Sequence, residues 1–157
     1  MKRLAIFVDV QNIYYTTRQT FSRQFNYRLF WERINELGDI QIANAYAIDR
    51  GDPQQQKFQA ALRHIGFEVK LKPYIQRIDG SSKGDWDVGI TIDALLSAES
   101  VDEVILLSGD GDFDLLLQTL RSRFQISSHL FSVADLTANS LINSADRWTE
   151  IDEKLLL

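Results

Sequence analysis

Short apolar runs rich in β-forming residues alternate with segments of helical periodicity along this chain of 157 residues. The apolar runs, which predict strands, cover 4–10, 40–48, 67–75, 103–109 and 126–133. Helical patterns cover 29–37, 53–65, 87–100, 112–124 and 137–147, and the Gly- and Ser-rich segment 77–85 predicts a loop. Because strands that alternate with helices form parallel sheets, the sequence predicts an α/β fold with one parallel sheet and helices on both faces.

Two of these elements have particularly clear local signals. The helix over 53–65 has Asp52 as a candidate N-cap, Pro53 in its first turn and Gly66 as its stop. The run 67–75 alternates apolar with charged side chains, so one face of this strand lies near solvent. Because Pro73 interrupts the hydrogen-bond ladder, we expect this strand towards an edge of the sheet.

Composition narrows the class of protein. The length and the 45% hydrophobic content predict a single globular domain over residues 1–157. There is no apolar stretch of about 18 residues, so no membrane span is expected. The absence of cysteine excludes disulfides and thiolate metal sites, and it fits a cytoplasmic protein. A net charge of −5 argues against non-specific coating of nucleic acid, but not against a nuclease whose acidic centre is neutralised by metal.

Carboxylates follow two of the predicted strands directly. The stretch LLSGDGDFD (106–114) ends a buried run with Asp110, Asp112 and Asp114, and Asp9 ends the first strand. Like charges repel, so the crowding needs a physical reason. Reactive sites of open parallel sheets lie beyond the carboxyl ends of the strands, where the strand order reverses. If the first and fourth strands are neighbours, Asp9 and Asp110 face each other there.

Helix capping is the simpler explanation for some of these acids. Asp112 and Asp87 both precede helical patterns and could cap them, and Asp114 could complement a helix dipole. Capping does not explain Asp9, which lies between apolar residues, where a carboxylate needs a cation or a donor as partner.

Taken together, four acids at strand ends and helix starts form a set of hard oxygen ligands: Asp9, Asp87, Asp110 and Asp112. Such a set suits Mg²⁺ or Mn²⁺ and offers no soft ligand. These ions usually meet phosphate oxygens, which indicates phosphoryl or phosphodiester chemistry. A bound cation would offset the repulsion between the carboxylates.

The same segments resemble a known family. In order, VDVQN (8–12), KGDWDVGITID (83–93), LLSGDGDFDLL (106–116) and NSLINSAD (139–146) resemble the successive motifs of NYN domains, which belong to the PIN-like nuclease superfamily. The resemblance extends from about Arg3 to Trp148. It implies a Rossmann-like (PIN-like) sheet of about five strands in the order 3-2-1-4-5 and a divalent-metal-dependent endoribonuclease. In that order the first and fourth strands are neighbours.

Residue by residue, the resemblance implies the following roles. Asp9 matches the metal ligand of the first strand, and Asn12 matches an asparagine that positions substrate or a metal-bound water. Asp87 matches the acid at the helix start, while Asp110 and Asp112 match the acidic pair after the fourth strand.

The match has two departures. Asp85 and Trp86 both stand between the Lys-Gly pair and Asp87, where the family often has one residue, so Asp85 stays open as an alternative to Asp87. Asp114 falls where some relatives have another acid, and we place it outside the main set. Asp93 also matches a family position, but six residues of helix turn it away from Asp87, which predicts a supporting or structural role.

In the implied mechanism, the acids hold one or two divalent ions on the scissile phosphate and an activated water attacks in line. Lys83 or a nearby arginine would stabilise developing charge. Neither His64 nor His129 belongs to a motif, and we interpret both as structural.

Cationic and aromatic residues flank the predicted strand-end loops. The cations are Arg18, Arg23, Arg28, Lys70, Lys72, Arg77 and Lys83, with Tyr14, Tyr15, Tyr74 and Trp86 among them. This combination suits single-stranded or structured RNA, although a solvated charged face with aromatic anchors in the core is an equal alternative. The candidate substrate contacts are Tyr15, Lys83, Trp86 and Ser108, of which Ser108 would also support the turn before Asp110.

Other functions fit less well. A nucleotide-binding Rossmann domain needs a glycine-rich turn after the first strand, and DVQNIYY has none. A haloacid-dehalogenase-type phosphatase needs a second Asp two residues after the first, where this chain has Gln11. The strongest alternative is a catalytically weak or inactive NYN module that binds RNA or a regulatory partner. The apolar end of EIDEKLLL leaves a homodimer open.

Overall fold

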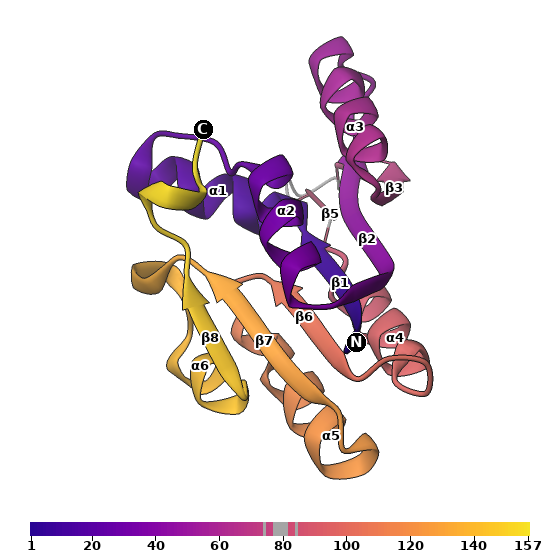
Figure 1. Ribbon diagram of the computed structural model, residues 1–157. Helices are drawn as coiled ribbons and strands as arrows, with labels where there is room; N and C mark the ends of the chain where they lie inside the picture. The colour runs from indigo at the N-terminus through magenta and orange to yellow at the C-terminus, as the bar shows by residue number, and fades with distance from the viewer. Residues whose placement is uncertain (74, 77–81, 84) are drawn as a thin grey trace.

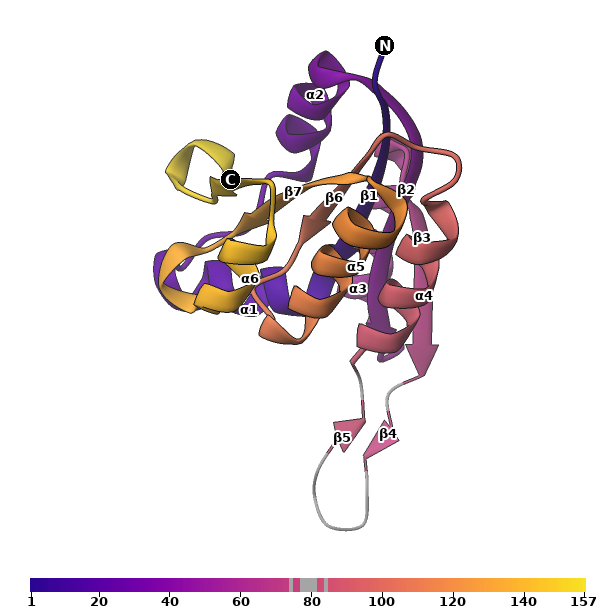
Figure 2. The same ribbon diagram turned by 90° about the horizontal axis from the view of Figure 1, so that it is seen from below.

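The computed structural model describes residues 1–73, 75–76, 82–83 and 85–157 (Figure 1). Its main sheet has six parallel strands in the order β3-β2-β1-β6-β7-β8. These strands are β1 (Arg3–Asp9), β2 (Asp39–Asp49), β3 (Glu68–Pro73), β6 (Glu103–Leu107), β7 (Ser127–Ser132) and β8 (Arg147–Glu150). Two short strands, β4 (Ile75–Gln76) and β5 (Ser82–Lys83), pair antiparallel outside this sheet (Figure 2).

Helices cover both faces of the sheet. They are α1 (Val10–Phe21), α2 (Tyr27–Leu37), α3 (Pro53–Ile65), α4 (Asp87–Ser97), α5 (Asp114–Phe124) and α6 (Asn139–Ser144). Three single 3₁₀ turns add η1 (Gly111–Phe113), η2 (Ala134–Leu136) and η3 (Glu153–Leu155). In Figure 2, α4, α5 and α6 lie on one side of the sheet and α2 on the other. Within the described residues, no helix combines the length and apolar character that a membrane span requires.

Each face of the sheet packs its own hydrophobic core. Alternate residues of β1 divide between them: Leu4, Ile6 and Val8 join the core with α1, α2 and α3, whereas Ala5 and Phe7 join the core with α4, α5 and α6. All five side chains are fully buried. Because β1 is buried on both faces, it reads as a continuous apolar run rather than an alternating one.

The predicted strand order is confirmed, and the structure adds a sixth strand. Residues 137–147 were expected to form one helix, but α6 ends at Ser144 and β8 begins at Arg147. The side chain of Asp146 accepts a hydrogen bond of 2.8 Å from the backbone nitrogen of Ser128, which fixes the chain beside β7. The indole of Trp148 then donates to the hydroxyl of Ser132 at 2.9 Å. The polar sequence RWTE does not show the alternation of apolar and polar residues that predicts a strand. Its extended structure depends instead on pairing with β7.

Two further elements were not predicted from the sequence. Residues 10–21 form helix α1, although their aromatic and β-branched composition gave no helical signal. Of the predicted loop 77–85, residues 77–81 and 84 lie outside the described part of the chain, and 82–83 form the short strand β5.

At the C-terminal end of the sequence, Leu155 and Leu156 are buried in the chain's own core, while Leu157 is exposed.

Candidate metal centre

The candidate site lies at the carboxyl edge of the sheet, where the strand order reverses between β1 and β6. Asp9 ends β1, and Val8 and Leu107 are partners across the two strands. The turn after β6 supplies Asp110 and Asp112, and Asp87 is the first residue of α4. The parallel arrangement therefore brings residues distant in sequence to one edge, as the sequence predicted.

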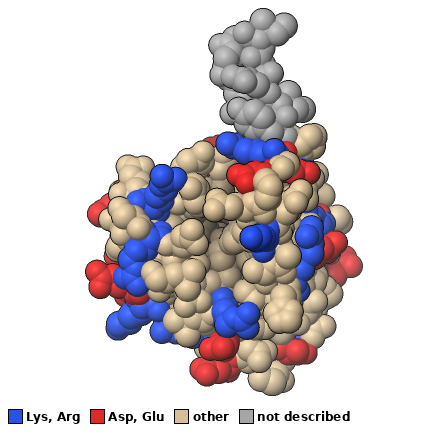
Figure 3. All heavy atoms as spheres, turned by 90° about the horizontal axis from the view of Figure 1, so that it is seen from above, with Lys and Arg blue, Asp and Glu red and all other residues tan. Residues whose placement is uncertain are grey.

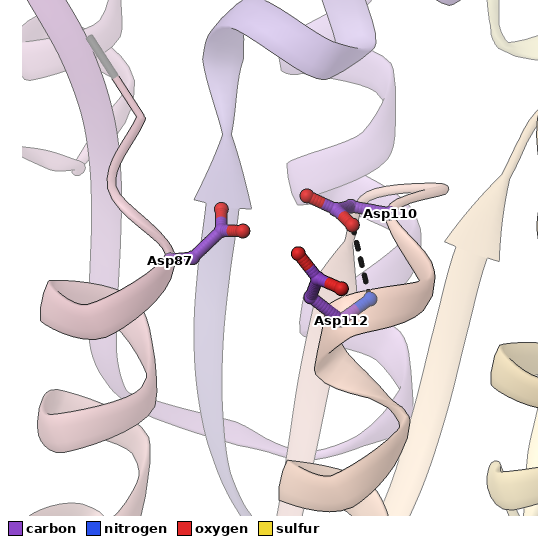
Figure 4. Close-up of side chains that lie close together, drawn as sticks. All are labelled: Asp87, Asp110 and Asp112. Atoms are coloured by element: carbon purple, nitrogen blue, oxygen red, sulfur yellow. Dashed lines mark hydrogen bonds between the residues drawn. The ribbon is translucent and has the colours of Figure 1, made fainter. Parts of the chain in front are cut away.

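Three carboxylates converge at this edge. Asp87, Asp110 and Asp112 each place one carboxylate oxygen within 4.8 Å of the others. Figure 4 shows these side chains pointing toward one another, Asp87 from α4 and the other two from the turn after β6. Within the described residues, none of the three forms an ion pair with lysine or arginine. The cluster offers hard oxygen ligands without an internal counter-charge, which suits a divalent cation.

Capping does not account for the cluster. Oδ1 of Asp110, rather than of Asp112, caps η1 by accepting a hydrogen bond of 3.0 Å from the backbone nitrogen of Asp112. Helices α4 and α5 have no side-chain capping bond, so neither Asp87 nor Asp112 serves as an N-cap. Asp85 instead accepts a hydrogen bond of 3.3 Å from the backbone nitrogen of Asp87. Asp87 thus lies in the cluster and Asp85 beside it.

Asp9 lies next to the three clustered acids and outside their group. Its carboxylate accepts from the backbone nitrogen of Asn12 at 3.4 Å and from the hydroxyl of Ser108 at 3.1 Å. Burial, together with the smaller effect of the charges of Asp110 and Asp85, raises the pKa of Asp9 to about 6, against the opposing effect of these two hydrogen bonds. The negative charge of Asp110 therefore already acts on Asp9.

The charged form of Asp87 is disfavoured by its surroundings. Burial, a hydrogen bond with Asp110 and the charges of Asp110, Asp85 and Asp9 raise its pKa to about 7. All of these causes disfavour the charged form. A cation bound among the carboxylates would reverse this effect, because it favours the ionised acids.

Asn12 and Gly109 hold the two strand ends together. Oδ1 of Asn12 accepts a hydrogen bond of 2.9 Å from the backbone nitrogen of Gly109. A Cβ atom at Gly109 would lie 2.6 Å from the carbonyl oxygen of Leu136, so the turn needs glycine for close packing against η2. The sequence gave no sign of this backbone contact, although the Ser-Gly pair before Asp110 marked the turn.

The remaining acids have other positions. Asp114 lies in the first turn of α5 and is not a member of the cluster. Asp93 accepts a hydrogen bond of 2.6 Å from the hydroxyl of Tyr46 and forms an ion pair of 2.9 Å with Lys70. Its contacts are those of a structural residue, as its position on the helix predicted.

The candidate substrate residues differ in accessibility. Tyr15 is 52% exposed on α1, whereas Ser108 is fully buried and bonded within the protein. Trp86 is half-buried: its indole donates to the carbonyl of Ala47 at 2.9 Å, and Lys72 lies 4.4 Å from its ring centroid. Nothing is described of the side chain of Lys83, and Tyr74 and Arg77 lie outside the described residues.

Neither histidine belongs to the acidic cluster. His129 is buried in β7 with Nε2 2.7 Å from the hydroxyl of Thr149, and burial lowers its pKa to about 4. His64 is exposed in the last turn of α3.

A parallel sheet in this order, with aspartates gathered where the order reverses, has the architecture of a PIN-like nuclease. The sequence profile of the NYN domain matches residues 3–152, and the chain belongs to this family of PIN-like fold. It is 31% identical to the low amplitude and bright protein LabA of Synechococcus elongatus over 96% of this chain and 84% of LabA. A crystal structure of VPA0982 from Vibrio parahaemolyticus, a protein of unknown function, is similar with a TM-score of 0.95. The two chains are 49% identical, over 99% of this chain and 96% of the other.

Proposed function

We propose that this NYN domain is a divalent-metal-dependent endoribonuclease of residues 1–157 that hydrolyses phosphodiester bonds with Mg²⁺ or Mn²⁺. The observation that carries the proposal is the convergence of Asp87, Asp110 and Asp112 within 4.8 Å without a basic partner among the described residues. Clustered acids reduce stability unless a ligand offsets their charge, so the arrangement indicates function rather than folding. The absence of cysteine is consistent with a cytoplasmic location.

The donor set fits a hard cation. Each of the three acids offers a carboxylate oxygen, and Asp9 offers a fourth carboxylate beside them. When bound, a divalent ion supplies activation of water and neutralisation of charge on the phosphate. This chemistry requires ionised carboxylates, which the ion itself favours.

The chain's own residues orient the reacting groups. Ser108 and the backbone nitrogen of Asn12 fix the carboxylate of Asp9, and the capping bond from Asp112 fixes that of Asp110. Helices α4 and α5 both begin at the cluster, so their dipoles favour an anion such as phosphate there.

The test is cleavage of labelled single-stranded RNA by the purified full chain, with Mn²⁺ or with EDTA. Asp110→Asn keeps the capping acceptor for η1 and removes one charge, so it tests the metal site with little effect on folding. The matched control is Glu36→Gln, an exposed charge at the far end of α2. We expect Mn²⁺-dependent cleavage by wild type and control, and its loss in Asp110→Asn. RNA binding without cleavage would instead assign a binding or regulatory module.

A further inference from the structure

A row of exposed side chains on α1 begins beside the metal centre and leads away from it. Because α1 starts directly after Asp9, its exposed face begins at the candidate site. Residues three or four apart share one face of a helix. On α1 and its C-cap, this face carries the half-buried Gln11 and the exposed Tyr14, Tyr15, Arg18 and Ser22, here called the α1 track. Arg18 lies nine residues beyond Asp9, which is about 14 Å along the helix axis.

Two aromatic rings of the α1 track face solvent. Tyr14 is 45% exposed and Tyr15 is 52% exposed, although the opposite side of α1 is buried in the core. Their ring centroids are 5.6 Å apart and their planes meet at 71°, so the two ring faces point in different directions. Exposed rings in this arrangement are platforms on which unpaired bases stack.

Cationic side chains adjoin the rings. Arg18 donates a hydrogen bond of 2.6 Å to the hydroxyl of Tyr14, which holds its guanidinium 5.7 Å from the centre of the Tyr14 ring. Arg23 donates to the backbone oxygens of Leu157 at 2.7 Å and of Leu156 at 3.4 Å, so its guanidinium is already engaged. Arg18 forms no ion pair with a carboxylate in the part of the chain that the structure describes. The positive charge of Arg18 is therefore available to an anion.

The surface between these residues is hollowed and free of acidic side chains. An open hollow of about 270 Å³ is lined by Tyr14, Arg18, Ser22, Arg23 and Gln24. It does not lie over the carboxylates but further along α1. Figure 3 views the carboxyl edge of the sheet, and blue and red side chains both lie on its left, where Figure 1 places the end of α1. The lining of the hollow itself includes two arginines and no acidic residue.

We propose that the α1 track binds the single-stranded RNA that extends from the scissile phosphate. A base stacks on Tyr15, and Arg18 binds a phosphate. The proposal rests on the ribonuclease function above and adds where the substrate lies and which strand class it belongs to. Stacked, paired bases cannot reach the tyrosine rings, so the α1 track favours single strands over duplexes.

The experiment is fluorescence anisotropy of a labelled 12-nucleotide RNA with the full chain in EDTA, where binding is separated from cleavage. Tyr15→Ala should weaken binding at least about fivefold, the loss expected for one stacked base, whereas Tyr15→Phe should bind like wild type. Arg18→Ala should weaken binding and lower the slope of log affinity against log salt by about 0.7, the value for one phosphate on a single strand. Arg123→Ala is the matched control, because it removes an exposed arginine from the last turn of α5.

The proposal is overturned if Tyr15→Ala and Arg18→Ala bind RNA as tightly as Arg123→Ala does. Equal affinity for a 12-base-pair RNA duplex would also overturn it, because a duplex offers no free base to Tyr15. Failure of the ribonuclease function is a separate result: no Mn²⁺-dependent cleavage by wild type, whatever the binding. If Asp110→Asn loses cleavage while Tyr15→Ala and Arg18→Ala bind RNA normally, the ribonuclease function is supported and RNA binding by the α1 track is contradicted.

Discussion

The hydroxyl of Ser108 donates a hydrogen bond of 3.1 Å to Oδ2 of Asp9, across the end of the β1–β6 pair. The hydroxyl oxygen of Ser108 in turn accepts a hydrogen bond of 3.2 Å from the backbone nitrogen of Asp110. One fully buried hydroxyl thus fixes the first-strand acid and the start of the acidic turn relative to each other. The geometry of the candidate site depends on this serine, although its hydroxyl is not accessible to substrate.

Ser108→Ala should therefore lower the free energy of unfolding by about 1–3 kcal/mol, because it leaves buried polar groups without their partner. Loss of the donor also raises the pKa of Asp9 further, since that hydrogen bond favours the charged carboxylate. Urea unfolding at pH 7 measures the change, with Ser122→Ala on the exposed side of α5 as control. Equal stability of both variants would show that Ser108 does not hold the site.

Substitutions of the individual aspartates should differ sharply in their effect on the rate of RNA cleavage. Asp9→Asn or Asp110→Asn should lower Mn²⁺-dependent cleavage at least about a hundredfold, the usual effect of removing a key electrostatic contact. Asp93→Asn should change the rate much less, because Asp93 contacts Tyr46 and Lys70 rather than the cluster. Initial rates at saturating Mn²⁺ provide the comparison. Similar losses in all three variants would contradict the separation of Asp93 from the site.

Asn12 should stabilise the fold through its side-chain oxygen, which accepts the hydrogen bond from Gly109. Asn12→Ala leaves the buried backbone nitrogen of Gly109 without its partner and should lower the free energy of unfolding by about 1–3 kcal/mol. Asn12→Asp keeps an acceptor but adds a negative charge near Asp9. We expect Asn12→Asp to approach wild-type stability at pH 5, where Asp9 is largely protonated, and to lose it at pH 8. Urea unfolding of wild type and Asn12→Asp at both pH values measures the difference in stability. The same difference at pH 5 and pH 8 would contradict the prediction.

The position of the acids could be predicted from the sequence because few local signals decide it. Apolar runs ending in Asp9 and Asp110 place both residues at the same edge of a parallel sheet. Helix α3, with Asp52, Pro53 and Gly66 at its ends, was likewise predictable from its caps.

Elements that depend on tertiary contacts were not predictable in this way. Helix α1 contains three threonines and two tyrosines, and the hydroxyls of Thr16 and Thr17 donate hydrogen bonds to backbone carbonyls one turn earlier. Strand β8 depends on the bond from Ser128 to Asp146 and on pairing with β7. The contact from Asn12 to Gly109 joins residues 97 positions apart, so no local pattern reveals it.

The metal-free protein should lose stability as the pH rises. The pKa values of Asp9 and Asp87 are about 6 and about 7 in the folded protein, above their ordinary value of 3.8. The native state therefore binds more protons than the unfolded state between about pH 4 and pH 7. The stabilisation that these acids contribute is complete below pH 4 and is lost as the pH rises through the folded-state values. For the more buried Asp9, the loss is about 2–3 kcal/mol.

Asp87→Asn and Mn²⁺ should each counteract this loss. In EDTA at pH 8, Asp87→Asn should raise the melting temperature, because it removes a repelling charge without removing a cap. Saturating Mn²⁺ should stabilise wild type more than Asp87→Asn at pH 8 and neither at pH 5, since protons compete with the ion for the carboxylates. Thermal melts at both pH values, with Glu36→Gln as control, test this.

If Asp87→Asn is less stable than wild type in EDTA, Asp87 is a structural residue. If Mn²⁺ raises the melting temperature of Asp87→Asn as much as that of wild type, Asp87 is not a ligand.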